Sequence, residues 1–197
     1  YKAGNSQSVK NALDFLNVES VMIKSPKEFN NVTRIILPGV GSAKATIEAL
    51  TEQQLLEPLT ANVHQKGMPF LGICIGHQIA FETSEEENTQ CFGWVKGNVR
   101  QFNKEKVRVP QMGWNKVKFN SQTHHLLKNI EEGYYYFVNS YYVVPKDQDI
   151  VFGVCQYEHE FCASYLKDNL FGVQFHIEKS GPLGLRLLKN YLSWNPH

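Results

Sequence analysis

The stretch Leu71-Gly72-Ile73-Cys74-Ile75-Gly76-His77-Gln78, directly after the apolar pair Pro69-Phe70, decides how this chain folds. An apolar strand that turns sharply into a helix at a Gly-x-Cys-x-Gly sequence is typical of a nucleophile elbow. The two glycines let backbone segments approach closely where side chains would collide. The sequence therefore predicts a buried strand over 69–73, a helix over 75–83, and Cys74 at the tip between them.

A cysteine at such a tip is suited to nucleophilic chemistry. The helix dipole favours its thiolate, and the N–H of Ile75 points to where an oxyanion would form. Later in the chain, His176 and Glu178 follow the apolar run 170–175. Alternate residues of a strand face the same way, so we expect both side chains to project from one strand end. They would supply the base and the orienting carboxylate of a Cys-His-Glu triad.

A third motif, Pro38-Gly39-Val40-Gly41, follows the apolar run 34–37. Its two glycines allow a peptide to turn so that an N–H near Val40 becomes a second oxyanion donor. Taken alone, each motif has an ordinary structural explanation: a turn, a buried inert thiol, a surface histidine. Together they place chemistry at the carboxyl ends of three strands, where α/β sheets gather their sites.

The rest of the chain indicates an α/β fold. In the first half, a helix is predicted over 8–16, strands over 20–23 and 34–37, and mostly helix over 43–64 with a new start near Pro58. After Cys91, the pattern predicts closely spaced strands and then a final helix over 182–192. The predicted strands cover 94–102, 114–119, 134–138, 150–156, 161–166 and 170–175. We predict a single domain over 1–197, with a flavodoxin-like, partly parallel sheet flanked by helices and an antiparallel portion in the second half.

The first residues do not fit a strand. An α/β fold of this kind opens with a strand before its first turn, yet 1–5 already has the composition of that turn. We expect the opening strand to be missing from this sequence, which would leave an apolar slot open in the sheet.

Composition excludes several classes of function. The 197 residues are 42% hydrophobic, as in a globular protein, and the net charge of +1 gives no electrostatic reason to bind nucleic acid or an anionic membrane. No run approaches the roughly 20 apolar residues of a membrane span. The four cysteines, Cys74, Cys91, Cys155 and Cys162, form no CxxC pair. This predicts a reducing, cytoplasmic setting without a zinc site, and nothing in the sequence indicates a metal or another cofactor.

Taken together, the motifs resemble the class I, triad-type glutamine amidotransferases. The resemblance covers nearly the whole chain and is strongest to the glutaminase subunits of imidazole glycerol phosphate synthases. Besides the Cys74 elbow, it rests on these stretches: Gly4-Asn5; Pro38-Gly39-Val40-Gly41; Pro110-Gln111-Met112-Gly113-Trp114-Asn115; Tyr136-Phe137-Val138-Asn139-Ser140-Tyr141; and Phe175-His176-Ile177-Glu178-Lys179-Ser180.

The resemblance implies hydrolysis of glutamine to glutamate and ammonia by Cys74, His176 and Glu178, with Val40 and Ile75 at the oxyanion. It also implies that ammonia passes through a channel to a (β/α)₈ synthase subunit, in a heterodimer that forms imidazole glycerol phosphate in histidine biosynthesis. By similarity, glutamine would be held by Gly41, Gln78, Glu86, Ser140 and Tyr141. The synthase would be met by Asn5, Trp114, Tyr136 and Lys179.

Three positions depart from the family pattern. Gln111 and Asn139 stand where histidine is usual, and Ile177 replaces the proline between the triad histidine and glutamate. We expect the exchange at Ile177 to loosen the placement of His176. The departures leave open a partner that aminates a nucleotide-linked or surface-polysaccharide sugar. A non-catalytic regulatory scaffold is the alternative from another class, but a pure binding module has no need of Cys74, His176 and Glu178 together.

Overall fold

The computed structural model describes residues 5–120 and 123–196. Gly4 of the Gly4-Asn5 stretch lies outside the described residues, as does most of the predicted turn over 1–5. The helices are α1 (Ser6–Phe15), α2 (Ala43–Glu52), α3 (Leu56–Thr60), α4 (Ile75–Gln78) and α5 (Gly181–Ser193). The strands are β1 (Ile35–Gly39), β2 (Phe70–Cys74), β3 (Thr83–Ser84), β4 (Thr89–Gln90), β5 (Gly97–Gln101), β6 (Gln111–Phe119), β7 (Gly133–Asn139), β8 (Tyr141–Pro145), β9 (Val151–Gln156), β10 (Glu160–Lys167) and β11 (Leu170–Val173).

The centre of the sheet is parallel, as the alternation of strand and helix predicts. β2 lies between β1 and β11 and pairs in parallel with both. The register places Gly39 of β1 beside Cys74, and Val173 of β11 beside Ile73. All three strands therefore end at one edge of the sheet, which brings the three predicted motifs together.

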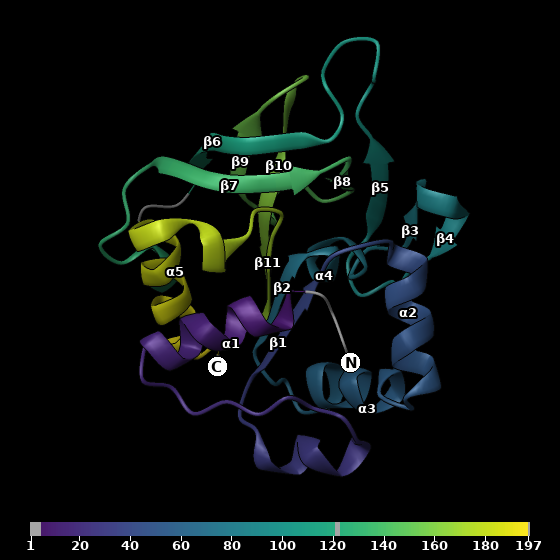
Figure 1. The fold of residues 1–197 in the computed structure, drawn as a ribbon, viewed down its shortest axis with the longest axis vertical. Coiled ribbons are helices and arrows are strands. Elements are labelled where there is room, and N and C mark those ends of the chain that lie inside the picture. Colours follow the sequence, from purple (N-terminus) through teal and green to yellow (C-terminus); the bar gives the residue numbers. More distant parts are fainter. Residues whose placement is uncertain (1–4, 121–122, 197) are drawn as a thin grey trace.

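Beyond β11 the sheet becomes mainly antiparallel. β10 pairs antiparallel with β11, β8 and β9, while β6 pairs antiparallel with β7 and β9. β5 then pairs antiparallel with β8 and parallel with β3. The result is the predicted mixed sheet, with the antiparallel portion curling over the carboxyl ends of the central strands (Figure 1).

Helices cover both faces of the central strands (Figure 1). The apolar face of α1, with Val9 and Leu13, packs with α5 and with Leu71 and Ile73 of β2. On the other face, α2, α3 and α4 pack on a second cluster that includes Phe70. This division follows from the alternation of side chains along β2, and it buries a core on each side of the sheet.

Two predicted elements differ from the structure. Residues 20–23 are extended but form no strand, and Val21 and Met22 are exposed because no neighbouring strand pairs with them. The helix predicted over 75–83 ends at Gln78. After it, the backbone bonds instead to the segment 92–95 and to β5, through Phe92 N–H to Ile79 O, Val95 N–H to Ala80 O and Glu82 N–H to Gly97 O. The strands β3, β4 and β8 were not predicted.

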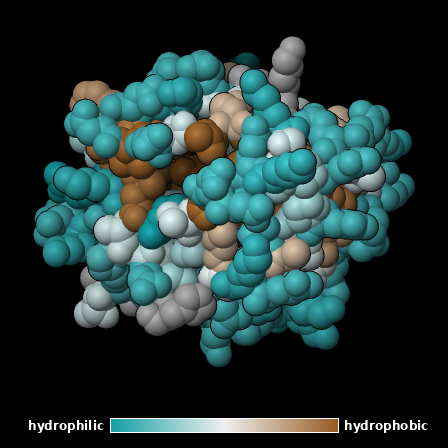
Figure 2. Space-filling model, turned by 90° about the horizontal axis from the view of Figure 1, so that it is seen from below, coloured by the Kyte–Doolittle hydropathy of each residue, from teal (hydrophilic) through white to brown (hydrophobic). Residues whose placement is uncertain are grey.

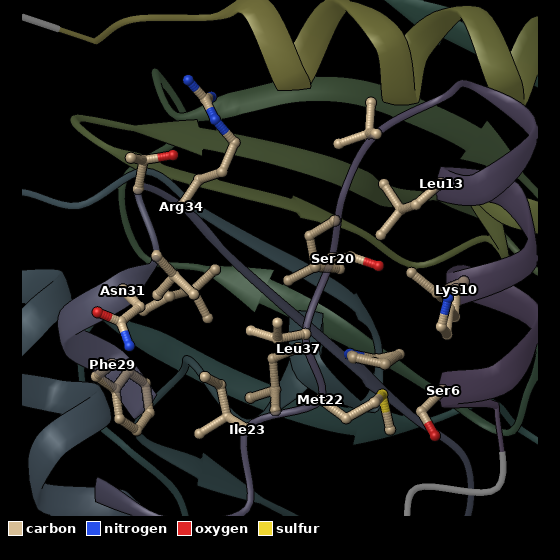
Figure 3. A pocket seen from close by; sticks show the side chains of 18 of the residues that line it. Ser6, Lys10, Leu13, Ser20, Met22, Ile23, Phe29, Asn31, Arg34 and Leu37 are labelled. Atoms are coloured by element: carbon tan, nitrogen blue, oxygen red, sulfur yellow. The ribbon is translucent and has the colours of Figure 1, made fainter. Parts of the chain in front are cut away.

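An apolar groove of about 620 Å³ runs along β1, which within 5–120 and 123–196 pairs only with β2. Seen from below, the surface is hollowed and apolar side chains are exposed there (Figure 2). Leu13 of α1, Met22 and Ile23 of the extended segment, and Leu37 of β1 line the groove (Figure 3). The sequence predicts such an open apolar slot in the sheet.

Candidate active site

Cys74 lies at the junction of β2 and α4 in a backbone conformation that an ordinary residue rarely adopts. Its φ is 54° and its ψ is −104°. Strained conformations of this kind persist where the surrounding structure holds them, and they are typical of a nucleophile at an elbow. The side chain is nearly buried, 5% exposed, as expected for a thiol at the bottom of a closed site.

The two glycines of the elbow are required by close backbone contacts. A Cβ at Gly72 would lie 2.4 Å from the carbonyl oxygen of Gly76. A Cβ at Gly76 would lie 1.9 Å from the carbonyl oxygen of Leu37 in β1. Neither distance is possible for a real side chain, so the tight turn at Cys74 depends on glycine at both positions.

His176 and Glu178 meet beside the nucleophile. The Nδ1 atom of His176 lies 3.0 Å from Oε1 of Glu178. The predicted pair is present, but the predicted reason for it is wrong. β11 ends at Val173, and Glu178 belongs to the 3₁₀ turn Ile177–Lys179, so a turn and not a strand end brings the carboxylate back to the ring.

The backbone of His176 is held on both sides. Its N–H donates to the carbonyl oxygen of Tyr136 at 2.8 Å. Its carbonyl accepts from the Ser180 hydroxyl at 2.7 Å, and that hydroxyl in turn accepts from the Tyr136 N–H at 3.0 Å. These bonds hold the backbone of His176 against β7. The looser placement of His176 expected from Ile177 stays a prediction.

Asn5 lies inside the site, 2% exposed. Its amide nitrogen is close to both Glu178 Oε1 and His176 Nδ1. Because the ring N–H at Nδ1 donates to Glu178, the amide of Asn5 donates to the same carboxylate. That Asn5 meets a partner subunit stays a prediction; within this chain its side-chain amide bonds to the carboxylate behind the histidine.

The surroundings of His176 favour its protonated form. Burial alone lowers its pKa, but hydrogen bonds with Cys74 and Glu178 and the charges of both groups outweigh that effect and raise the pKa from 6.5 to about 9. Burial raises the pKa of the Glu178 carboxyl group, whereas the hydrogen bond to His176 and the charge of His176 lower it. The lowering effects together are larger, so the pKa of Glu178 lies below its usual value. The site can therefore hold an imidazolium between a thiolate and a carboxylate.

The loop after β1 lies next to the nucleophile, because Gly39 is the register partner of Cys74. Gly41 has a φ of +107°, which only glycine adopts readily, and Val40 is 43% exposed. α2 starts immediately after the loop, with the Ser42 hydroxyl accepting from Ala45 N–H at 3.2 Å. The loop is thus partly exposed, and its far end is fixed to a helix.

The residues predicted to hold glutamine form one connected group. Gln78 donates through Nε2 to the carbonyl oxygen of Tyr141 at 3.0 Å. Burial and the nearby charge of Glu86 raise the pKa of Tyr141. Glu86 accepts from the N–H of Ala43 at 2.7 Å, two residues after Gly41. Ser140 lies between β7 and β8, next to Tyr141.

Apart from the buried Asn5, the residues predicted to meet a partner lie on the outer face of β6 and β7 and on the turn after His176. Trp114 is 53% exposed, and its ring is 5.9 Å from that of Tyr136, whose own ring is 6.5 Å from His176. Lys179 is exposed beside them. Met112 and Tyr134, which were not predicted, extend the same exposed face.

The two amides that replace histidine are direct cross-strand partners, since Gln111 of β6 lies opposite Asn139 of β7. Both are buried, and Oε1 of Gln111 and Oδ1 of Asn139 have no hydrogen-bond partner. The nitrogen of Asn139 donates to Tyr141 O at 2.9 Å. Two of the three departures are therefore one local pair between β6 and β7, and the side-chain amide of Gln111 lies beside Cys155.

Gln174 was missed. Its Nε2 lies 3.7 Å from Cys74 Sγ. It stands two residues before His176, so the alternation of side chains along a strand could have placed it on the same side as the histidine. The Cys74 thiol also contacts a group that no sequence pattern reveals, the carbonyl oxygen of Val138, at 3.8 Å.

Within the described ranges, no cluster of three or more His, Cys, Asp or Glu side chains could hold a metal ion. The same part of the chain has no helix that is long and apolar enough to cross a membrane.

An elbow cysteine beside a buried histidine–carboxylate pair on a mixed α/β sheet defines a class of enzyme, and sequence comparison agrees. The family model for class-I glutamine amidotransferases matches residues 1–193, and the chain belongs to this family.

Particular relatives are similar over almost their whole length. The imidazole glycerol phosphate synthase subunit HisH of Geobacillus sp. (strain WCH70) is 42% identical, with 98% of this chain and 93% of the relative covered. The subunit HisH 2 of Methanococcus maripaludis is 36% identical, with 98% and 96% covered.

Solved structures share the fold at lower identity. A glutamine amidotransferase crystal structure matches with a TM-score of 0.75 and 14% identity, covering 95% of this chain and 92% of that one. PurLQS from Thermotoga maritima matches with a TM-score of 0.73 and 18% identity, covering 96% and 92%.

Proposed function

We propose that this chain is the glutaminase subunit of an imidazole glycerol phosphate synthase, acting in histidine biosynthesis in the cytoplasm. The observation that carries the proposal is the strained Cys74 at the end of β2, with His176 and Glu178 assembled behind it. The 42% identity to a HisH subunit supports this particular acceptor among those that amidotransferases serve.

The first half of the reaction releases ammonia. The thiolate of Cys74 attacks the side-chain amide carbon of glutamine, and the N–H of Ile75 and a loop N–H near Val40 stabilise the oxyanion. His176, held protonated, gives its proton to the amide nitrogen as the C–N bond breaks. Ammonia leaves, and a thioester to Cys74 remains.

The second half hydrolyses the thioester. Neutral His176 takes a proton from water, and the resulting hydroxide attacks the thioester carbon. The C–S bond breaks to regenerate the thiolate, while His176 keeps its proton and the acid proton of glutamate goes to solvent. Glu178, oriented by Asn5, holds the imidazole through both steps.

The glutamine would lie with its amino-acid end against Gln78, Glu86, Ser140 and Tyr141. A carboxylate such as Glu86 suits an ammonium group, and the buried Oε1 of Gln78 has no partner and can accept an N–H. Glycine at position 41 allows the positive φ of the loop; space does not require it, since a Cβ there would meet no atom of the described residues within 4 Å.

The partner in this proposal is a (β/α)₈ cyclase that receives ammonia directly in a heterodimer. The support is the exposed face of Met112, Trp114, Tyr134 and Tyr136, which lies over the triad and is unusually rich in large apolar side chains for a free surface. Ammonia released into water is protonated and lost as a nucleophile, so a covered route from the triad favours a partner at this face.

The experiment measures glutamine hydrolysis by the chain mixed with such a cyclase, with and without the cyclase's nucleotide substrate. We expect slow turnover by the chain alone and a large stimulation when the loaded cyclase is present. Cys74→Ala abolishes glutamine use but spares synthesis from added ammonia, whereas Cys91→Ala, a buried thiol away from the triad, keeps both.

Other outcomes separate the alternatives. Hydrolysis that the cyclase and its substrate do not stimulate would contradict the histidine assignment and favour a sugar-aminating partner. No hydrolysis in the complex, with the cyclase still active on ammonia, would contradict the glutaminase and favour a regulatory scaffold.

A further inference from the structure

Two buried amide side chains connect the predicted glutamine site to the nucleophile. Gln78 lies at the end of α4, and Gln174 follows β11; both are at most 2% exposed. Gln78 Nε2 lies 2.9 Å from Gln174 Oε1, and Gln174 Nε2 lies 3.7 Å from Cys74 Sγ. This makes an unbroken chain of polar contacts from substrate site to sulfur.

The orientation of both amides follows from the donors and acceptors around them. A backbone carbonyl can only accept, so the atom of Gln78 that faces Tyr141 O at 3.0 Å is the nitrogen. The same nitrogen faces Gln174 at 2.9 Å, so the atom there is the oxygen. The other end of the Gln174 amide, the end that faces Cys74, is therefore its NH₂ group.

We propose that Gln174 donates a hydrogen bond to the Cys74 thiolate, and that Gln78 holds the Gln174 amide in the donating orientation. The inference rests on the proposed role of Cys74 as the nucleophile and adds a residue to its machinery. Gln174 acts on the sulfur directly, while Gln78 acts on it through Gln174.

The surroundings of Gln174 disfavour the reversed orientation of its side-chain amide. The side chain has no exposed surface, and the residue's backbone N–H is bonded to Ala163 O at 2.8 Å. A reversed amide would place its NH₂ against the NH₂ of Gln78 and its oxygen against an anionic sulfur. Both contacts are repulsive in a buried site, so the donating orientation is strongly preferred.

The arrangement also ties the nucleophile to substrate binding. Oε1 of Gln78 is buried and has no hydrogen-bond partner among residues 5–120 and 123–196, so an N–H of bound glutamine can donate to it. That contact polarises the Gln78 amide further and strengthens its bond to Gln174. The thiolate is thereby supported most when the substrate is present.

The test follows the alkylation of Cys74 by iodoacetamide in the full chain across neutral and alkaline pH, with the modified peptide identified by mass. The other three thiols do not compete, because burial raises the pKa of Cys91 and of Cys155 to about 11 and that of Cys162 to about 12. Gln174→Met keeps the length of the side chain and removes the N–H donor. A hydrogen bond to a charged group is lost, so we expect the midpoint of the profile to move to higher pH and alkylation at neutral pH to slow about tenfold to a hundredfold.

Two further variants sharpen the result. Gln111→Met also removes a buried amide beside a thiol, since Gln111 Nε2 lies 3.9 Å from Cys155 Sγ, and it must leave the Cys74 profile unchanged. Gln78→Met frees the Gln174 amide to rotate and is expected to move the profile in the same direction by a smaller amount. It also serves as the test if Gln174→Met fails to fold.

An unchanged Cys74 profile in Gln174→Met, or in Gln78→Met where the first variant does not fold, would overturn the inference. A shift of equal size in Gln111→Met would overturn it as well. Because alkylation needs no glutamine, the result is independent of hydrolysis. A chain that hydrolyses glutamine with an unchanged profile refutes only the role of Gln174, and a chain that shows the shift but no hydrolysis refutes only the proposed function.

Discussion

At the scale of single residues, the site depends on its reacting side chains and also on glycines, whose lack of a side chain allows close backbone contacts. Gly76 leaves room for the carbonyl of Leu37, and this close approach allows the strained conformation of Cys74. Two groups beside the Cys74 sulfur stabilise a negative charge on it: a histidine whose pKa is raised, and an amide N–H from Gln174. Each feature leads to a measurable effect of one substitution.

Gly76→Ala tests the close contact without backbone strain, because the φ of Gly76 is not positive. We expect the free energy of unfolding to fall by more than about 3 kcal/mol, since the backbone of β1 must move. Gly93→Ala is the matched control: its Cβ would meet no atom within 4 Å, but its φ is +71°. That change should cost only about 1–2 kcal/mol. Equal losses in denaturant unfolding of the two variants would contradict the account.

Glu178→Gln tests the electrostatics of His176. The pKa of His176 is raised from 6.5 to about 9, so its protonated form adds stability below about pH 6.5, and that stability is lost as the pH rises through about 9. We expect unfolding free energy to decline over this range, by about 1–3 kcal/mol. Removing the carboxylate charge lowers the pKa, so the decline becomes smaller and the alkaline limb of glutamine hydrolysis moves to lower pH.

Glu132→Gln serves as the control for this substitution. Glu132 pairs with Lys116 at 2.7 Å on the surface, where an ion pair contributes little. Its pH profiles should match those of the unsubstituted chain. A profile for Glu178→Gln that also matches would mean that the carboxylate does not set the protonation of His176.

At the scale of elements, the site is assembled by the ends of three parallel strands and closed by β7. β1 ends before the loop that carries Val40, β2 ends in Cys74, and β11 ends before the segment that carries Gln174 and His176. β7 supplies the carbonyls of Tyr136 and Val138. Glu86 then connects this assembly to α2 through the N–H of Ala43.

Glu86 accepts a hydrogen bond from the N–H of Ala43, and we propose that it also binds the ammonium group of glutamine; different variants separate the two. Glu86→Gln keeps an oxygen for the Ala43 N–H but removes the charge that would hold an ammonium. We expect the KM for glutamine to rise about tenfold to a hundredfold, with stability nearly unchanged. Glu86→Ala also leaves the start of α2 without this acceptor and should cost about 1 kcal/mol more in thermal unfolding. An unchanged KM in Glu86→Gln would refute its role in binding glutamine.

The helices and strands of the site could largely be predicted from local pattern, and the failures have physical causes. The elbow, the order of the three motifs and the helix Gly181–Ser193 follow from glycine placement and apolar periodicity. The extended segment 20–23 has strand composition, but a strand needs a hydrogen-bonded neighbour, which composition does not report. α4 ends early because the backbone after it bonds to a segment more than ten residues away.

The contacts between the site residues were harder to predict than the identity of those residues. Cys74, His176 and Glu178 carry recognisable spacing, whereas the contact of Asn5 with Glu178 joins residues 173 positions apart. Gln174 could have been found by alternation along the strand. The carbonyl of Val138 could not, because any residue supplies a carbonyl and only the tertiary structure aims it.

At the scale of the whole molecule, one sheet carries a core on each face, and we propose that residues 1–197 form one folding unit. Large apolar side chains are exposed on the outer face of β6 and β7, the strands that lie above the central sheet in Figure 1. Met112, Trp114 and Tyr134 are each more than half exposed there. Large apolar side chains gathered beside an active site indicate that a partner covers them.

Trp114→Ala tests this surface. An exposed aromatic anchor at the centre of an interface contributes about 2 kcal/mol, so we expect the Kd for the cyclase to rise about thirtyfold. The stimulation of glutamine hydrolysis at a fixed cyclase concentration should fall in parallel. Phe15→Ala is the control, because Phe15 is 72% exposed but lies at the end of α1. Equal effects of the two substitutions in a binding titration would place the interface elsewhere.

The central claim is that Cys74 is the nucleophile that attacks glutamine. The most direct measurement treats the full chain, in complex with its cyclase, with an electrophilic glutamine analogue and locates the adduct by peptide mass. The account predicts one adduct, on Cys74, formed more slowly when glutamine competes and absent in Cys74→Ala. An adduct on Cys91, Cys155 or Cys162 in place of Cys74, or no adduct in a complex that is active with ammonia, would contradict it.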